Sequence, residues 1–229
     1  MSRVPPTAMI IALIPVKELT RGKQRLQPIL SAQERHLRSK AMLEDVLSVV
    51  AASPLFDRVL MITSDGEAAA LARQHGAGVI KEARQIRQSQ SVDAASTICR
   101  QMGAEAMLTL PLDVPLVTAD DLTRIVDKGI ASPGVVLAPS RDRLGTNALL
   151  ARPPDTIPFR FGFDSFQAHR REAETRGLPC EVCELPNVAL DIDEIEDLRC
   201  FLETPGQTRT HELLRRLEIE GRLGVGKSA

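Results

Sequence analysis

Short runs of apolar residues alternate along the chain with longer stretches that carry the spacing of an amphipathic helix. The run 9–14 (MIIALI) has no polar position and stops at Pro15, which is typical of a strand buried on both faces. Residues 58–63 (RVLMIT), 78–81 (GVIK) and 106–112 (AMLTLPL) are further short segments that are mostly apolar. We therefore predict four strands in the first half of the chain, each followed by a helix.

Capping residues mark where the predicted helices begin. Ser31 precedes helical spacing over 32–52, and Glu34 stands three positions further on, which is the pattern of a capping box. Ser64 and Glu67 mark the next start in the same way. The remaining helices are predicted to lie over 64–76, 92–102, from Thr118 with Asp121, and over 166–176, 194–203 and 211–220.

The second half of the chain predicts a change of strand direction. Residues 134–139 and 146–151 have the pattern of a β-hairpin, and 181–185 read as a last strand. The fold class is therefore α/β: a three-layer αβα sandwich with a mixed, mostly parallel sheet. We expect a single domain over 1–220 and a disordered Gly-rich tail at 221–229. In such sheets a ligand lies beyond the carboxyl ends of the strands.

Composition narrows the class of protein. Hydrophobic residues make up 43% of the chain, and without Trp or Tyr the core must be aliphatic. A formal net charge of −1 gives no overall basic field for nucleic acid or an anionic membrane, so we expect neither as a partner. No apolar run approaches the roughly 20 residues of a membrane span, and 1–8 lack a signal-peptide pattern, so the expected location is cytoplasmic.

Two motif matches do not have the context that their chemistry requires. The terminal GRLGVGKS has phosphate-loop spacing but follows a predicted helix, whereas that loop works between a strand and a helix. Cys180 and Cys183 lie three apart in a predicted strand, so they should face opposite sides of the sheet. We interpret both thiols as structural.

Positive charge gathers where the first strand ends. Lys17, Arg21, Lys23 and Arg25 fall within nine residues, and no glycine-rich dinucleotide loop is present there. Several cations at the carboxyl end of a strand suit a triphosphate. Taken alone, the cluster favours a solvated basic loop that binds no ligand. Nucleic-acid binding is a weaker reading, because no aromatic side chains accompany the charges.

Acidic residues follow two later elements. Asp113 comes after the apolar run 106–112, and since Thr118 supplies the next helix cap, Asp113 is a metal-ligand candidate as well as a turn residue. Asp191 and Asp193 are two apart and share a face in extended chain. Asp193 with Glu196 could instead cap the helix 194–203. Separated aspartates of this kind commonly hold Mg²⁺ beside substrate phosphates.

Together these segments resemble the CofC/FbiD guanylyltransferases, which share a fold group with molybdenum-cofactor guanylyltransferases and sugar-phosphate nucleotidyltransferases. Five family elements occur in family order between residue 9 and about residue 200, and they are PVKELTRGKQRL, LDVPLV, GTNALL, FGFDSFQAH and LDIDEIEDL. The resemblance implies a Rossmann-like nucleotidyltransferase domain. It implies transfer of GMP from GTP to the phosphate of 3-phosphoglycerate, phosphoenolpyruvate or 2-phospholactate, with Mg²⁺ and in coenzyme F-420 biosynthesis.

The same resemblance assigns roles to individual residues. It places Pro15, Val16, Lys17, Lys23, Arg25 and Asp93 at the nucleotide, with Lys17, Lys23 and Asp113 as catalytic residues. Asp113, Asp191 and Asp193 would bind the metal, and Thr146, Asn147, Gly162 and Ser165 the acceptor. Plain structural roles stay open for the acceptor set: a strand position for Thr146, a turn for Asn147 or Gly162, and a helix cap for Ser165. His169 could make a structural contact or a ligand contact.

Two positions depart from the family pattern. Arg143 stands where D-G-x-G-T-N has a glycine, and Asp93 stands where asparagine is common. An additional arginine favours a more anionic acceptor such as 3-phosphoglycerate. Alternatives left open by the sequence are a sugar-phosphate or molybdopterin acceptor and a non-catalytic nucleotide-binding protein. The oligomeric state is also open, a homodimer included.

Overall fold

A computed structural model describes residues 8–19, 24–82, 87–129 and 133–224. Within these ranges a single sheet has seven strands in the order β3-β2-β1-β4-β6-β5-β7. The strands are β1 (Ile10–Pro15), β2 (Arg58–Thr63), β3 (Gly78–Lys81), β4 (Ala106–Thr109), β5 (Gly134–Pro139), β6 (Thr146–Arg152) and β7 (Cys180–Val182). All run parallel except β6, which pairs antiparallel with β4 and β5, so the predicted mixed sheet is confirmed.

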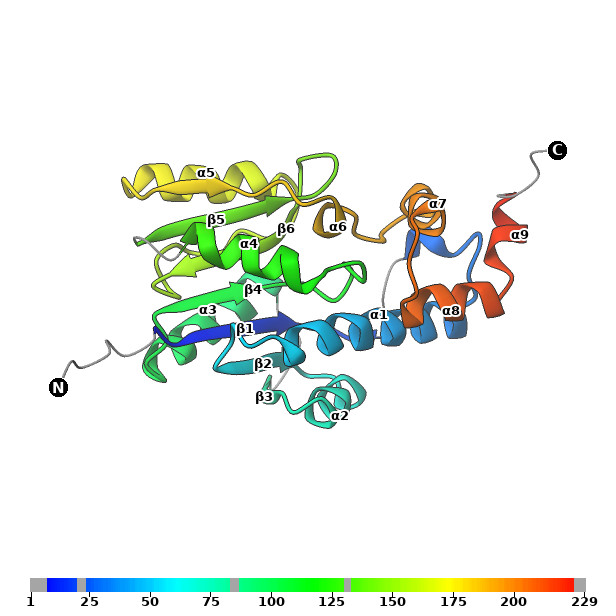
Figure 1. The fold of residues 1–229 in the computed structure, drawn as a ribbon, viewed down its shortest axis with the longest axis horizontal. Helices are drawn as coiled ribbons and strands as arrows, with labels where there is room; N and C mark the ends of the chain where they lie inside the picture. The colour runs from blue at the N-terminus through cyan, green and yellow to red at the C-terminus, as the bar shows by residue number, and fades with distance from the viewer. Residues whose placement is uncertain (1–7, 20–23, 83–86, 130–132, 225–229) are drawn as a thin grey trace.

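Helices cover both faces of this sheet and complete the predicted three layers (Figure 1). One core cluster joins the sheet to α1 (Ala32–Ala52), α2 (Gly66–Gln74), α4 (Ala119–Gly129) and α6 (Pro186–Ala189). The other cluster joins it to α3 (Gln88–Gln101) and α5 (Ser165–Thr175). Cys183 belongs to the first cluster and Cys180 packs against the second, so the two thiols do face opposite sides.

A third core cluster lies beyond the carboxyl ends of the parallel strands, at the right of Figure 1. It packs the outer part of α1 against η2 (Gln24–Leu26), α7 (Ile195–Glu203), α8 (Arg209–Arg216) and α9 (Ile219–Leu223). The helix predicted over 211–220 is therefore two helices, separated where Glu218 has a φ of 54°. The predicted disordered tail is wrong for Gly221–Leu223, which belong to α9, and 225–229 lie outside the described residues.

Several predicted boundaries also need correction. The capping box of Ser31 and Glu34 is present. Helix α2 is capped by Asp65 rather than Ser64, because the Asp65 carboxylate accepts the backbone amides of Glu67 and Ala68. Strand β4 ends at Thr109, before Pro111, which has no amide hydrogen for a ladder. Helix α3 begins four residues earlier than predicted, β7 ends at Val182, and the short α6 was not predicted.

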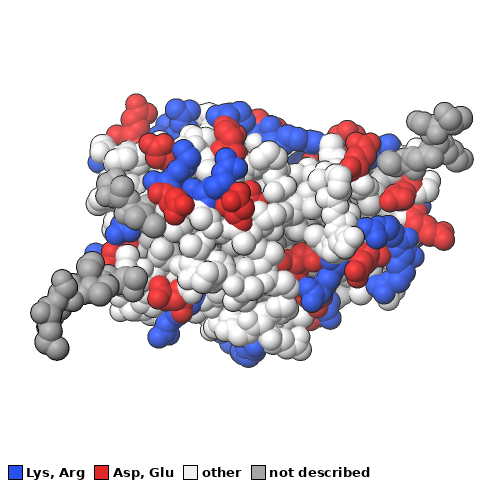
Figure 2. Space-filling model, in the orientation of Figure 1, with Lys and Arg blue, Asp and Glu red and all other residues white. Residues whose placement is uncertain are grey.

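The surface carries charges of both signs. On the face shown in Figure 2, basic and acidic side chains are interspersed around a broad uncharged area, and neither sign forms a continuous patch. This agrees with the net charge of −1. Among the helices of the described ranges, none is long and apolar enough to cross a membrane.

Candidate active site

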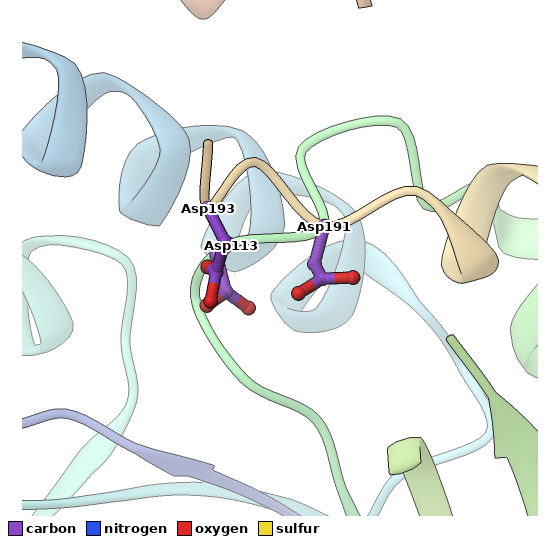
Figure 3. A group of neighbouring side chains, drawn as sticks. All are labelled: Asp113, Asp191 and Asp193. Atoms are coloured by element: carbon purple, nitrogen blue, oxygen red, sulfur yellow. The ribbon is translucent and has the colours of Figure 1, made fainter. Parts of the chain in front are cut away.

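Three carboxylates meet beyond the carboxyl end of the sheet. Asp113 lies in the loop after β4, and Asp191 and Asp193 lie in the loop between α6 and α7. One oxygen of each carboxylate lies within 4.8 Å of an oxygen of both others, and the three side chains turn to the same side (Figure 3). The prediction that these three residues come together is thus met, although Asp191 follows a short helix rather than a strand.

Hydrogen bonds from the backbone and from one side-chain amide hold the loop after β4 and the loop between α6 and α7 together. The amide of Ile192, between the two aspartates, donates to the Asp113 carbonyl at 3.0 Å. From strand β6 the Asn147 side-chain amide donates to the Asp191 carboxylate at 3.0 Å and to the Val188 carbonyl at 2.9 Å. Asn147, predicted to contact the acceptor or to fill a turn, is therefore a buried residue that orients a carboxylate of this group.

Asp193 does not cap the following helix. The N-cap of α7 is Glu194, and the Asp197 carboxylate accepts the amides of Asp193 and Glu194 at 3.1 and 3.0 Å. The predicted Asp193–Glu196 capping box is therefore wrong by one position, because the helix begins at Ile195. This shift leaves the Asp193 carboxylate turned toward Asp113 and Asp191.

A buried arginine, which was not predicted, lies next to Asp113, Asp191 and Asp193; these three residues are called the acidic group from here on. Arg38 of α1 is fully buried, and its guanidinium donates to the Ile192 carbonyl at 3.4 Å. Burial lowers its pKa to about 10, while the Asp113 carboxylate opposes that shift, so Arg38 is protonated at neutral pH. A sequence signal existed: Arg38 lies four residues before Met42 on the inward stripe of the helix, where a charge is unusual.

The predicted basic residues fall at the same edge of the molecule as far as they are described. Pro15 and Val16 are buried at the end of β1, and Lys17 is exposed directly after them. Arg25 lies 3.7 Å from the Glu194 carboxylate. Lys23 lies outside the described residues. Arg25 lines a pocket with two of the acidic residues, and its full lining is Arg25, Ser140, Arg141, Asp142, Gly145, Asp191, Asp193, Glu194 and Asp197.

The predicted acceptor residues form a hydroxyl cluster where β6 begins. The Ser165 hydroxyl accepts the amide of Thr146 at 2.9 Å, and the Thr146 hydroxyl lies 3.0 Å from Nδ1 of His169. Ser165 is thus the first residue of α5 and not its cap, which is Asp164. Gly162 is exposed and has a φ of 130°, a conformation that only glycine adopts without strain. The cluster lies at the same sheet edge as the carboxylates.

The two positions that depart from the family pattern make local contacts. Asp93 lies in α3, and its carboxylate accepts the amide of Phe159 at 2.8 Å. Arg143 is paired with the Glu184 carboxylate, and its guanidinium carbon lies 5.1 Å from the centre of the Phe166 ring. Asp93 therefore stabilises the segment that contains Phe159. The Arg143 side chain is held at the protein surface by Glu184 and Phe166.

The donor set of the acidic group suits a hard divalent cation. Carboxylate oxygens are the ligands that Mg²⁺ prefers, and three of them held at this spacing leave further positions for water or phosphate oxygens. Asn147 orients the Asp191 carboxylate, and the backbone hydrogen bond from Ile192 to Asp113 holds the two loops together. The described residues thus offer three carboxylates that could hold a cation, two of which line a pocket together with Arg25.

Comparison with known families agrees with this geometry. The family described as guanylyl transferase CofC like matches residues 10–227. A phosphoenolpyruvate guanylyltransferase of Roseiflexus sp. (strain RS-1) is 39% identical over 207 residues, covering 90% of this chain and 91% of the relative. A 3-phospho-D-glycerate guanylyltransferase of Colwellia psychrerythraea is 34% identical over 89% of this chain and 97% of its own. A 2-phospho-L-lactate guanylyltransferase of Methanothermobacter thermautotrophicus is 34% identical over 91% of each chain.

Solved structures share the fold at low sequence identity. A proposed nucleotide-diphospho-sugar transferase from Desulfovibrio desulfuricans G20 superposes with a TM-score of 0.76 at 15% identity, covering 95% of this chain and 97% of its own. A 4-diphosphocytidyl-2C-methyl-D-erythritol synthase gives a TM-score of 0.61 at 13% identity over 85% of this chain and 98% of its own. These neighbours confirm the predicted nucleotidyltransferase fold.

Proposed function

Because the chain belongs to the family of CofC-like guanylyl transferases, we propose that it transfers GMP from GTP to the phosphate of a small phosphorylated acid and releases pyrophosphate. The acceptor class is 3-phosphoglycerate, phosphoenolpyruvate or 2-phospholactate, as in the names of its relatives. The product would serve the biosynthesis of coenzyme F-420. The observation that carries the proposal is the convergence of Asp113, Asp191 and Asp193 next to the Arg25 pocket.

The reaction needs charge compensation more than proton transfer. An oxygen of the acceptor's phosphate attacks the α-phosphorus of GTP, and the bond from that phosphorus to the bridging oxygen of the β-phosphate breaks. The electron pair leaves with pyrophosphate. A phosphate monoester is largely dianionic at neutral pH, so its oxygen is already a nucleophile and no general base has to remove a proton.

The acidic residues supply a place for a magnesium ion. Asp113, Asp191 and Asp193 would hold it, and when bound it offsets phosphate charge and orients the reacting oxygens. Asn147 keeps the Asp191 carboxylate in place for that purpose. Arg38 limits the repulsion among the three carboxylates, since its buried positive charge acts on Asp113.

Basic residues at the end of β1 are assigned to the triphosphate. Lys17 is exposed beside the strand end, and Arg25 lines the pocket that contains Asp191 and Asp193. Fixed cations at this position bring two polyanions together and stabilise the charge that builds up on the leaving pyrophosphate. The role of Lys23 in this set stays a prediction from the family resemblance.

A pyrophosphate-release assay tests the proposal. GTP, ATP, CTP and UTP are each combined with the three acids in the presence of Mg²⁺. We expect release with GTP and at least one acid, and no release when the acid is omitted. Release from none of the combinations, or release with GTP that does not depend on any of the three acids, would overturn the proposed function.

One aspartate variant links the assay to the acidic group. Asp113→Asn should lower turnover by at least about a hundredfold, the scale of losing one preorganised electrostatic group. Asp127→Asn is the matched control, because Asp127 is exposed on α4 and outside the acidic group. Turnover by Asp113→Asn equal to that of the control would remove the cation role.

A further inference from the structure

His169 lies between two hydrogen-bond partners with fixed requirements. It is fully buried on α5, where its Nε2 atom lies 2.8 Å from the backbone nitrogen of Arg160. On the other side of the ring, Nδ1 lies 3.0 Å from the Thr146 hydroxyl oxygen. The imidazole therefore connects the segment before α5 to the first residue of β6.

These contacts determine which ring nitrogen carries the hydrogen. A backbone N–H can only donate, so Nε2 of His169 must accept from Arg160 and the ring hydrogen must be on Nδ1. Nδ1 then donates to the Thr146 hydroxyl oxygen. Burial lowers the pKa of His169 to about 4, and the nearby Arg160 charge adds to the shift. Glu172 and a contact with the Ser165 backbone oppose the shift, but the ring is neutral near pH 7.

The hydroxyl groups in this cluster are left with donor capacity. Because the Thr146 oxygen accepts from His169, its own hydrogen has to find another acceptor. The Ser165 oxygen accepts the Thr146 amide and likewise keeps its hydrogen. Within the described ranges the structure gives neither hydroxyl hydrogen a protein acceptor, although Thr146 and Ser165 are only 5% and 2% exposed. Two oriented O–H donors at a sheet edge suit an anionic oxygen.

We propose that His169 is a positioning residue that fixes the Thr146 hydroxyl as a hydrogen-bond donor to an anionic oxygen of the phosphorylated acceptor. The inference rests on the proposed function, since it concerns the acceptor of that reaction. His169 itself touches no reacting atom, because both ring nitrogens are engaged with the protein.

A pair of substitutions separates the two contacts of the ring. Asn places its amide near the position of Nδ1, so His169→Asn can still donate to Thr146 but cannot reach Arg160. Gln places its carbonyl near the position of Nε2, so His169→Gln can still accept from Arg160 but does not donate to Thr146. If His169 serves only to hold the Arg160 segment, the Gln variant should keep more activity than the Asn variant. If His169 positions the Thr146 hydroxyl, the Asn variant should keep more activity than the Gln variant.

Steady-state kinetics with each variant provides the readout. We expect His169→Gln to raise KM for the acceptor by about tenfold, the scale of one hydrogen bond to a charged group, with KM for GTP unchanged. His169→Asn should stay within about threefold of wild type. In a Thr146→Val background, where the hydroxyl is absent, His169→Gln should have no further effect on the acceptor KM.

Other results would overturn the inference. Equal acceptor KM in the Gln and Asn variants, or better function with Gln, would assign His169 to holding the Arg160 segment while the proposed function stands. A wild type that releases pyrophosphate with no acid overturns both proposals. If the variants fail to fold, long-range ¹H–¹⁵N correlation of the wild type's four histidines decides the matter, because a hydrogen on Nε2 of His169 contradicts the assigned tautomer.

Discussion

Arg143 occupies a backbone conformation that residues with side chains rarely adopt. Its φ is 59°, in the left-handed region that favours glycine, at a position where the family pattern has a glycine. The family's glycine is thereby explained by the turn geometry and not by a ligand. The arginine side chain compensates locally through Glu184 and the Phe166 ring. These contacts weigh against the sequence-based idea that Arg143 selects a more anionic acceptor.

Replacing this arginine by glycine should therefore change little. Arg143→Gly removes about 1 kcal/mol of backbone strain and loses a half-exposed ion pair worth about 0–1 kcal/mol. We expect the free energy of unfolding in urea to stay within about 1 kcal/mol of wild type and the KM for each acid within about twofold. A tenfold rise in KM for one acid alone would place Arg143 at the acceptor after all.

At the scale of elements, the sequence pattern predicted all seven described strands. The clearest are strands such as β1 and β5, which are buried along their whole length and contain no polar side chain. The long helices followed from their caps and spacing. The failures are local. Four-residue α6 is too short to show a period, and the break at Glu218 depends on one left-handed residue within a continuous helical pattern.

Helix α8 shows how a tertiary contact fixes an element. Asp45 of α1 is buried, and its carboxylate accepts the amides of Arg209 and Thr210 at 2.8 and 2.9 Å and the Thr210 hydroxyl at 2.7 Å. One side chain thus satisfies two of the amides that the start of α8 leaves unpaired. No local sequence pattern predicts this contact, because Asp45 and Arg209 lie 164 positions apart in the chain.

Weakening this contact should loosen the C-terminal helices. Asp45→Asn keeps the size of the side chain but loses its charge and one acceptor, so we expect it to lower the free energy of unfolding by about 2 kcal/mol. Equilibrium unfolding in urea, followed by circular dichroism, measures the change. Glu212→Gln, an exposed position at the start of the same helix, serves as the control and should cost less than about 0.5 kcal/mol. Equal effects of both variants would contradict the assigned role of Asp45.

At the scale of the whole molecule, the site lies where the α/β sandwich meets the third core cluster (Figure 1). Asp113 and Asp191 are distant in sequence, yet the rule that ligands gather at the carboxyl ends of strands predicted that they would meet. Arg38 and the orienting role of Asn147 could not be predicted in that way. Both act through side chains that cross from one layer to another, and only the packed structure shows which partners they reach.

The central claim is that three carboxylates from two loops form one site for a divalent cation. Titration of the nucleotide-free protein with Mn²⁺, followed by the electron paramagnetic resonance signal of free Mn²⁺, tests it without relying on activity. We predict binding that Mg²⁺ reverses, and a loss of affinity of about tenfold or more in each of Asp113→Asn, Asp191→Asn and Asp193→Asn, but none in Asp127→Asn. Mn²⁺ affinity that is the same in all four variants and the wild type would contradict the account.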